Sequence, residues 1–573
     1  MKDTENSMNK DMDGRKRRSA VEQVQHAVPA PPAPPAASPV SGGPGHPGNV
    51  VDARQPETPA NPSGSASAGA SRSRVASRVS LAVITVVVLV ALIVTVVLVP
   101  LPGWLVDSAK AGDATGAKQV DQTDLTYYCP SRMALSDNGK YGDSAFQASE
   151  GNVASSARYS AFGSIYEASV GAVTNGSEAD NKKLTGSDTV DSAMVKTYSG
   201  SADQGSQAFE TRLLAAKSGT GAAASVASWA SEGDLKGLAA STCIAPALEQ
   251  DFLLGPTTTG VTQQLSVANF SSKATSLQVQ IWSTKHGTPL QLSTGNVVNI
   301  GANGEATLEL SAAAPGNEAL FVKVKSKETP IAAVVRSIEL DGLNAKGSDY
   351  AVPLNAASKK AYLPGVSGDD QVTVFARAEH DTDLNLSWVD GNGAASAKMQ
   401  HLEADKVVPV DLGKAPDGVV GLQASASSPV NVTAKVTQNA DSGTDFAYVS
   451  PSPAFAQSAL VVPDHTDGTV VLLNTSGSET TATLQGYDTS GKPVGDKQIG
   501  IPANAGTSVL AKDVGDNAVM FTLKNGKDVS MGMRLTQPDV AQAKLASVAY
   551  LGSSGLEPRN MKVWANDNAG IVR

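Results

Sequence analysis

The longest apolar run of the chain extends from Val79 to Val99 and contains 21 residues without a charged side chain. A helix rises about 1.5 Å per residue, so this run spans a hydrocarbon core about 30 Å thick. Arginines precede the run directly, whereas Trp104 and Asp107 follow it. Basic residues favour the cytoplasmic side, so the pattern predicts a transmembrane signal-anchor helix with a cytoplasmic N-terminus. The protein is expected in the cell membrane, in contact with lipid through this one helix, with an extracytoplasmic C-terminal body.

A cleavable signal peptide is the alternative interpretation, because Ala109-Lys110-Ala111 forms a small-residue triplet after the apolar run. Cleaved signals have apolar cores of about 7–15 residues, which is shorter than this run, so an uncleaved anchor fits better. Before the helix, residues 27–70 are dominated by Pro, Ala, Gly and Ser. Such a composition buries too little apolar surface to fold, so the cytoplasmic tail is predicted to be disordered.

Beyond the helix the apolar positions alternate with a period of two. Leu277, Val279 and Ile281 alternate with Gln278 and Gln280, for example, which is the pattern of half-buried strands. Dipeptides that end in glycine, such as Asn525-Gly526, are typical of hairpin turns between such runs. The sequence therefore predicts an all-β ectodomain built of antiparallel β-sandwiches.

The pattern also repeats three times at intervals of about 100 residues. Each repeat has a third strand that ends in an aromatic residue, and a later hairpin that carries a basic residue. We expect the aromatic residues to be core or corner residues and the basic residues to lie on the solvent face. The aromatic positions are Trp282, Trp388 and Tyr487, and the basic positions are Arg336, Lys435 and Arg534.

The repeats resemble immunoglobulin-like sandwiches in architecture but lack the intersheet cysteine pair and its packed tryptophan. Residues 121–245 alternate only weakly, and we interpret them as a fourth, disulfide-closed β-module. The four modules are expected to form a rod with separate cores. The C-terminal tail either adds an edge strand through Val563-Trp564 or frays. The predicted organisation is a tail (1–78), a transmembrane helix (79–99), a linker (100–120), a β-module (121–245), three sandwich repeats (246–355, 356–453 and 454–556) and a C-terminal tail (557–573).

The chain contains only two cysteines, Cys129 and Cys243, and both follow the predicted helix in an oxidising space. They allow one intramolecular pairing, which would close a loop of about 115 residues and stabilise the fold by about 4–5 kcal/mol. Two buried free thiols are the alternative. The spacing excludes a C-x-x-C redox motif, so we predict a structural disulfide.

Net charge and the absence of known motifs exclude several classes of function. The formal net charge of −10 offers no extended cationic surface for phosphates, so no nucleic-acid partner is expected. The sequence lacks the zinc-protease, serine-hydrolase and nucleotide-binding motifs, and no cofactor, metal or catalytic residue is predicted. Two polar clusters, 380–383 around His380 and 464–467 around His465, offer possible ligands for a cation or a general base. Turn chemistry is the favoured explanation of both clusters.

A short signature resembles a family of actinobacterial single-pass envelope proteins whose extracytoplasmic domain has no assigned function. In that family a Cys-Pro pair follows the helix, and a Gly-Leu-Ala-Ala-x-x-Cys motif precedes an aromatic strand. Where the family commonly carries a tryptophan pair, this sequence has Asp251-Phe252. The resemblance implies a membrane glycosyltransferase as a partner. The matching positions are Cys129, Pro130, Gly237, Leu238, Ala239, Ala240 and Cys243.

We therefore expect a non-catalytic, membrane-anchored binding or scaffold protein of the cell envelope that contacts cell-wall glycan or a glycosyltransferase and supports envelope glycan assembly. The alternative is an enzyme that acts on envelope glycan, or the obligate subunit of a membrane glycosyltransferase. A glycosidase needs only two carboxylates in a cleft, which a sequence alone does not exclude.

Overall fold

The computed structural model describes residues 117–137, 147–174, 180–186 and 194–564. The chain divides into two compact units, Met1–Pro102 and Gly103–Arg573, and every described residue belongs to the second unit. The tail and the predicted helix over 79–99 lie outside the described residues. Within the described ranges, no helix has the length and apolar character needed to cross a membrane.

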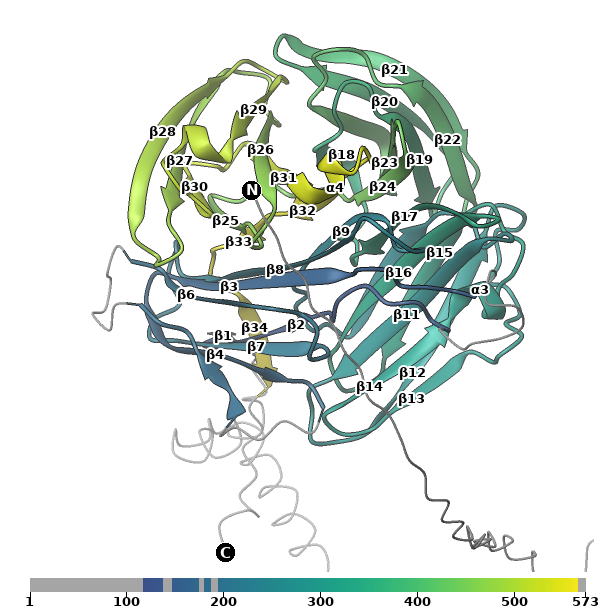
Figure 1. The fold of residues 1–573 in the computed structure, drawn as a ribbon, viewed down its shortest axis with the longest axis horizontal. Helices are drawn as coiled ribbons and strands as arrows, with labels where there is room; N and C mark the ends of the chain where they lie inside the picture. The colour runs from purple at the N-terminus through teal and green to yellow at the C-terminus, as the bar shows by residue number, and fades with distance from the viewer. Residues whose placement is uncertain (1–116, 138–146, 175–179, 187–193, 565–573) are drawn as a thin grey trace, which may run out of the picture. The chain divides into compact units, whose positions relative to one another are not determined.

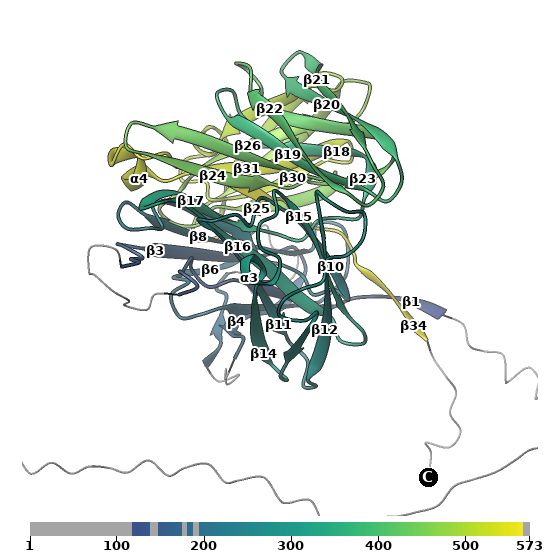
Figure 2. The ribbon, with the colours of Figure 1, turned by 90° about the vertical axis from the view of Figure 1, so that its right-hand side faces the viewer.

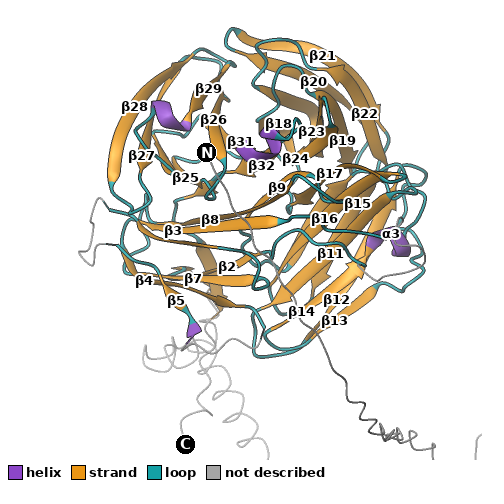
Figure 3. Ribbon diagram, in the orientation of Figure 1, coloured by secondary structure: helices purple, strands orange, loops and turns teal. Residues whose placement is uncertain are grey.

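The described residues form four consecutive β-sandwiches, here numbered 1 to 4 (Figure 1, Figure 3). The prediction of an all-β, antiparallel sandwich fold is thereby confirmed. Each sandwich contains two sheets. In the first two sandwiches the sheet orders are β2-β7-β4-β5 with β6-β3-β8-β9, and β10-β15-β12-β13 with β14-β11-β16-β17.

The strands of sandwich 1 are β2 (Asp124–Cys129), β3 (Ala154–Phe162), β4 (Ile165–Ala172), β5 (Lys182–Lys183), β6 (Lys196–Gly200), β7 (Gln207–Leu213), β8 (Gly221–Ala230) and β9 (Gly237–Thr242). The elements of sandwich 2 are β10 (Glu249–Leu254), β11 (Val261–Asn269), β12 (Thr275–Ser283), β13 (Val297–Ile300), β14 (Gly304–Glu309), the short helix α3 (Leu310–Ala313), β15 (Leu320–Ser326), β16 (Ile331–Asp341) and β17 (Asn344–Ala351).

Sandwich 3 contains β18 (Ser358–Pro364), β19 (Gln371–Ala378), β20 (Thr382–Asp390), β21 (Gly393–Leu402), β22 (Val407–Lys414), β23 (Gly421–Ala440) and β24 (Gly443–Val449). Sandwich 4 contains β25 (Gln457–Val461), β26 (Asp467–Asn474), β27 (Thr480–Tyr487), β28 (Pro493–Ile501), β29 (Gly506–Leu510), the 3₁₀ turn η3 (Ala511–Asp513), β30 (Met520–Lys524), β31 (Val529–Thr536), α4 (Pro538–Gln542), β32 (Ala549–Gly552) and β33 (Ser554–Gly555).

All four sandwiches share one strand order. Numbered within a sandwich, the sheets are 1-6-3-4 and 5-2-7-8. In sandwich 3 the long strand β23 serves as both the sixth and the seventh strand, and in sandwich 4 the short strand β33 adds to the first strand as a ninth. The first strand therefore pairs with the sixth. Immunoglobulin domains have sheets ABED and CFG, in which the first strand pairs with the second. The architecture is a sandwich as predicted, but the strand order is not that of immunoglobulin domains.

The four sandwiches close into a ring, because sandwich 4 also contacts sandwich 1 (Figure 1, Figure 2). Arg158 in β3 donates to the carbonyl of Val462 at 2.7 Å, and Ser225 in β8 donates to the carbonyl of Val461 at 2.9 Å. Trp229 and Leu238 of sandwich 1 belong to the apolar core of sandwich 4. The prediction of a rod of modules with separate cores is therefore wrong.

The two ends of the described chain pair with each other. β1 (Ala117–Asp121) and β34 (Asn560–Trp564) form an antiparallel ribbon. Arg559 donates to the hydroxyl of Tyr127 at 3.1 Å and lies over its ring, which attaches the ribbon to sandwich 1. Of the two outcomes considered for the C-terminal tail, Val563-Trp564 is part of a strand.

Candidate functional site

The three repeated basic residues lie at the joints between sandwiches. Arg534 makes two hydrogen bonds of 2.8 Å to Asp370, whose side chain is 0% exposed. Lys435 contacts both carboxylate oxygens of Glu339 at 2.5 and 2.6 Å, and Arg336 donates to Ser131. The prediction that these side chains face solvent is therefore wrong. Period-two alternation shows which face of a strand is polar, but it does not show that a neighbouring sandwich covers that face.

Two further arginines lie at joints of the ring. Arg158 is fully buried and pairs with Asp464 of sandwich 4. Burial lowers the pKa of Arg158, and the charge of Asp464 opposes this shift. Arg377 of sandwich 3 lies over the rings of Phe321 and Trp282 of sandwich 2, 4.3 and 4.9 Å from their centroids. Cation–π contacts of a desolvated guanidinium each stabilise by about 2 kcal/mol.

The repeated aromatic residues have the predicted structural role. Trp282 and Tyr487 are buried in the cores, and Trp388 is half-buried against the core of sandwich 3. Trp282 packs against Phe321, and Tyr487 packs against Phe162 of sandwich 1. Tyr487 therefore also joins sandwich 4 to sandwich 1.

The aspartates of the two histidine clusters make structural contacts, one in a turn and one at a joint between sandwiches. Asp381 accepts a hydrogen bond from the backbone N–H of Ala404 at 2.7 Å, and Asp464 forms an ion pair with Arg158. His401 contacts Asp383 at 2.8 Å on the surface, and this hydrogen bond raises the pKa of His401. In the part of the chain that the structure describes, no three His, Cys, Asp or Glu side chains group as metal ligands.

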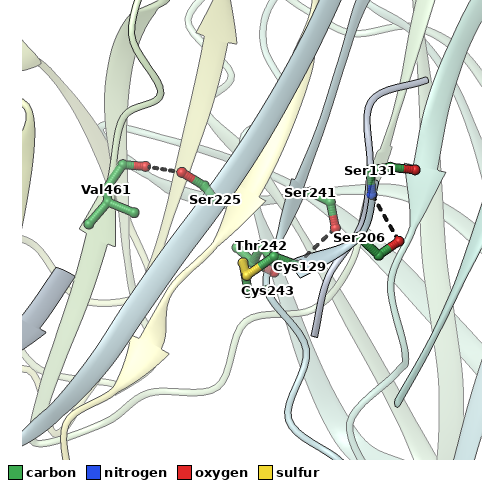
Figure 4. Close-up of a disulfide and its surroundings, with 8 residues drawn as sticks. All are labelled: Cys129, Ser131, Ser206, Ser225, Ser241, Thr242, Cys243 and Val461. Carbon is green, nitrogen blue, oxygen red and sulfur yellow. Dashed lines mark hydrogen bonds between the residues drawn. A yellow bond between two sulfur atoms is a disulfide. The ribbon is translucent and has the colours of Figure 1, made fainter. Parts of the chain in front are cut away.

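Cys129 and Cys243 form a disulfide (Figure 4). Cys129 ends β2 and Cys243 follows β9, so the bond joins the two sheets of sandwich 1. Beside it, Tyr128 and Ile244 exchange backbone hydrogen bonds of 2.8 and 2.7 Å. The disulfide thus fixes the last strand of sandwich 1 where the chain leaves for sandwich 2.

The eighth strands of the four sandwiches, β9, β17, β24 and β32, contact one another in the middle of the ring, and we call them the hub. Asp445 in β24 accepts hydrogen bonds from the N–H groups of Leu238 (2.9 Å), Val548 (3.0 Å) and Phe446 (3.0 Å). Asp349 in β17 accepts from Ala240 (3.2 Å) and Tyr448 (2.7 Å). These two buried carboxyl groups connect β9, β17 and β24 with one another and with the residue that directly precedes β32.

The hub explains the Gly-Leu-Ala-Ala motif of the sequence. A Cβ atom on Gly237 would lie 2.4 Å from a carboxyl oxygen of Asp445, and the φ angle of Gly237 is +126°. Only glycine combines this backbone conformation with this close approach. The amides of Leu238 and Ala240 are two of the donors to the buried carboxyls. The motif therefore encodes a strand that receives side chains from two other sandwiches.

Burial raises the pKa of both hub carboxyls well above the usual range, and Asp349 raises the pKa of Asp445 further by repulsion. The folded state therefore keeps protons that the unfolded chain releases near pH 3.9, and this contribution to stability falls as pH rises from about 4 through the raised pKa values. We expect the free energy of unfolding of wild type, minus that of the Asp349→Asn/Asp445→Asn variant, to decrease with pH in that window. Urea unfolding at a series of pH values measures the difference, and an increase with pH would contradict the assignment.

Two adjoining cavities lie where the linkers between sandwiches converge, and we call them together the linker groove. One has a volume of about 300 Å³ and is lined by residues from all three linkers, including Ala245, Asn355 and Phe455. The other has a volume of about 270 Å³ and extends along sandwich 3. Both cavities share the stretches 354–355 and 451–453 in their linings.

The second cavity follows from the path of β23. In sandwich 3 this strand passes from one sheet to the other without a turn, and its pairing with β18 shifts register between Ser358 and Lys360. In sandwiches 2 and 4 the equivalent strands are separate elements joined by turns. Val430 and Asn431 of this strand line the cavity together with residues of the linkers, such as Asn355.

Sequence reasoning missed both the hub and the groove, although one signal was present. Gly-Ser-Asp-Tyr-Ala (347–351) and Gly-Thr-Asp-Phe-Ala (443–447) are near copies, each with a buried aspartate. An aspartate inside an otherwise apolar strand indicates a buried polar contact. The two aspartates occupy different positions relative to the repeated basic residues. Asp349 directly precedes Tyr350, the partner of Arg336 in the neighbouring strand. Asp445 lies three residues before Tyr448, the partner of Lys435.

Residues 197–512 match the model of a family described as a family of unknown function (DUF5719), a span of more than half the chain. The matched span includes three of the four hub strands and both hub aspartates, but it ends before β32. No curated protein matches the chain.

Proposed function

Because the chain belongs to this family of unknown function, DUF5719, its role has to be argued from the geometry, and we propose that it is a non-catalytic scaffold of the cell envelope. In this proposal the helix over 79–99 anchors the chain in the membrane, and the ring lies outside the cell and binds partners of the envelope glycan machinery. The observation that carries the proposal is the closed ring, in which buried charged groups lock four sandwiches together.

A closed ring of this kind can act as a rigid surface on which partners bind. Each joint contains a buried or half-buried charged side chain. Where this side chain belongs to a buried ion pair, as Arg534 does with Asp370, removal of one partner costs about 3–5 kcal/mol. Relative motion of the sandwiches is therefore suppressed, and loops from different sandwiches keep fixed positions. Two of the linkers are also hydrogen-bonded to each other, since Asn355 donates to the carbonyl of Pro451 at 3.0 Å. A partner that binds across two sandwiches would pay little entropy to order them.

The test combines location and partners in intact cells. Protease added to wall-stripped cells should digest the ring and spare the N-terminal tail. The full-length chain, isolated from native membranes in mild detergent, should bring down a discrete partner of the glycan machinery. The His380→Ala/His465→Ala variant should retain both the partner and the cellular phenotype of wild type, because these side chains serve turns and surface positions.

The opposite outcome identifies an enzyme. If one substitution of a histidine or carboxylate outside the hub and the joints abolished the phenotype while the melting temperature stayed unchanged, the scaffold proposal would be wrong. A C-terminus protected from protease would contradict the proposed location.

A further inference from the structure

We propose that the linker groove binds a short stretch of neutral saccharide. This inference deepens the proposed function and rests on it, because it assigns the chemical class of one envelope ligand to a defined place on the ring. In the groove, two adjoining cavities, a largely buried carboxamide that opens into one of them and hydrogen-bonded walls coincide. Ligand sites typically have volumes of about 300–1,000 Å³, and the two cavities together fall in this range.

The side chain of Asn431 points to a ligand. Asn431 lines the cavity along sandwich 3 and is 8% exposed, yet its carboxamide has no hydrogen-bond partner among the residues that the structure describes. Its polar atoms are not among the side-chain atoms that the protein encloses without a partner, so the carboxamide opens into the cavity and is available to a ligand. A carboxamide both donates and accepts, which matches a hydroxyl group on a ligand.

The walls of the groove are pre-formed. Ser452 donates its backbone N–H to the carbonyl of Tyr362 at 3.0 Å, and the Tyr362 hydroxyl donates to the carbonyl of Thr475 at 3.1 Å. Ser452 also donates its hydroxyl to the carbonyl of Met531 at 2.7 Å. Sandwiches 3 and 4 are thus joined at the floor of the groove, and a ligand needs to order little of it.

Charge and surface chemistry select the ligand class. The charged residues of the lining are Glu249, which is paired with Lys323 and Lys325, and Lys360 at the exposed edge. One free cation at the edge does not form a phosphate or carboxylate site. The rest of the lining is uncharged and combines hydroxyl and carboxamide side chains with proline, aromatic and aliphatic side chains. A neutral sugar presents both hydroxyl groups and apolar C–H faces, which match such a mixed, uncharged lining.

Binding of the full-length protein in detergent to defined probes tests the inference. The probes are maltotetraose, mannotetraose and arabinotetraose, with tetragalacturonate and a neutral proline-containing tetrapeptide as the other classes. Saturation-transfer NMR and calorimetry should show binding of at least one neutral tetrasaccharide at or below about 10 mM. Asn431→Ala should weaken it about tenfold. Ala356→Trp, which fills the exposed mouth of the groove, should abolish it.

The control is Asn385→Ala, an exposed asparagine of the same sandwich that does not line the groove. It should bind like wild type, and melting curves establish that all three variants are folded. Absence of saccharide binding, binding of only the acidic sugar or the peptide, or saccharide binding that both groove variants retain would each overturn the inference. Any of these results with an intact partner complex from native membranes would leave the scaffold proposal standing.

Discussion

Replacing Asp445 by alanine should lower the free energy of unfolding by about 3–5 kcal/mol. The carboxyl group accepts hydrogen bonds from the amides of Leu238 in β9, Phe446 in β24 and Val548, which directly precedes β32. Alanine leaves all three donors unpaired in a dry interior, and each unpaired buried donor costs about 1–3 kcal/mol. Relief of the buried carboxyl's own desolvation offsets part of this loss. Urea unfolding at neutral pH measures the change.

Two further variants separate the hub contacts from general effects of substitution. Asp441→Ala removes an exposed carboxylate from the same hairpin and should change stability by less than about 0.5 kcal/mol. Asp445→Asn keeps one acceptor oxygen and the size of the neutral acid, so it should cost less than alanine. A loss below about 1 kcal/mol for Asp445→Ala would show that the hub amides find other partners and that the hub does not hold the ring together.

Strands were predictable from the sequence where one face is buried and the other is solvated. The segment 275–283 alternates clearly, because β12 has one face in the core of sandwich 2. The segment 121–245 alternates weakly for a physical reason. All ten residues of β8 are buried, and small side chains such as Ala222, Ala224 and Ala227 fill both faces. Small residues pack where two layers approach closely, and they leave no hydrophobic period to detect.

Closure of the ring was not predictable from local pattern. The joints depend on pairs such as Arg534 with Asp370 and Arg158 with Asp464, whose members are 164 and 306 residues apart in sequence. Each member alone is typical of a solvated strand edge, so a single sequence favours the solvent-exposed interpretation. The linker groove depends in turn on the closed ring, since its walls come from linkers that only the ring brings together.

Replacing Cys243 by serine should destabilise the whole ring in one transition. The disulfide closes a loop with a sequence separation of 114 residues, for which chain-entropy models give about 4–5 kcal/mol. The loop ends at the hub, because Cys243 directly follows β9. Leu238 of that strand packs in the core of sandwich 4 and donates to Asp445 of sandwich 3. Loosening β9 therefore weakens three sandwiches together.

Calorimetry of the wild-type protein, the Cys243→Ser variant and the wild-type protein with reductant separates coupled from independent sandwiches. We expect one unfolding peak in all three samples, at a similar lower temperature in the last two. Trp229 of sandwich 1 and Trp388 of sandwich 3 should report the same midpoint in variants that keep one of them as the main fluorophore. If sandwich 1 melted early while the residues of sandwiches 3 and 4 kept their wild-type midpoint, the sandwiches would be independent and the hub would carry little of the stability. The ring predicts the coupled result, because a strand that supplies hydrogen-bond donors to two neighbours cannot unfold without leaving their buried carboxyls unpaired.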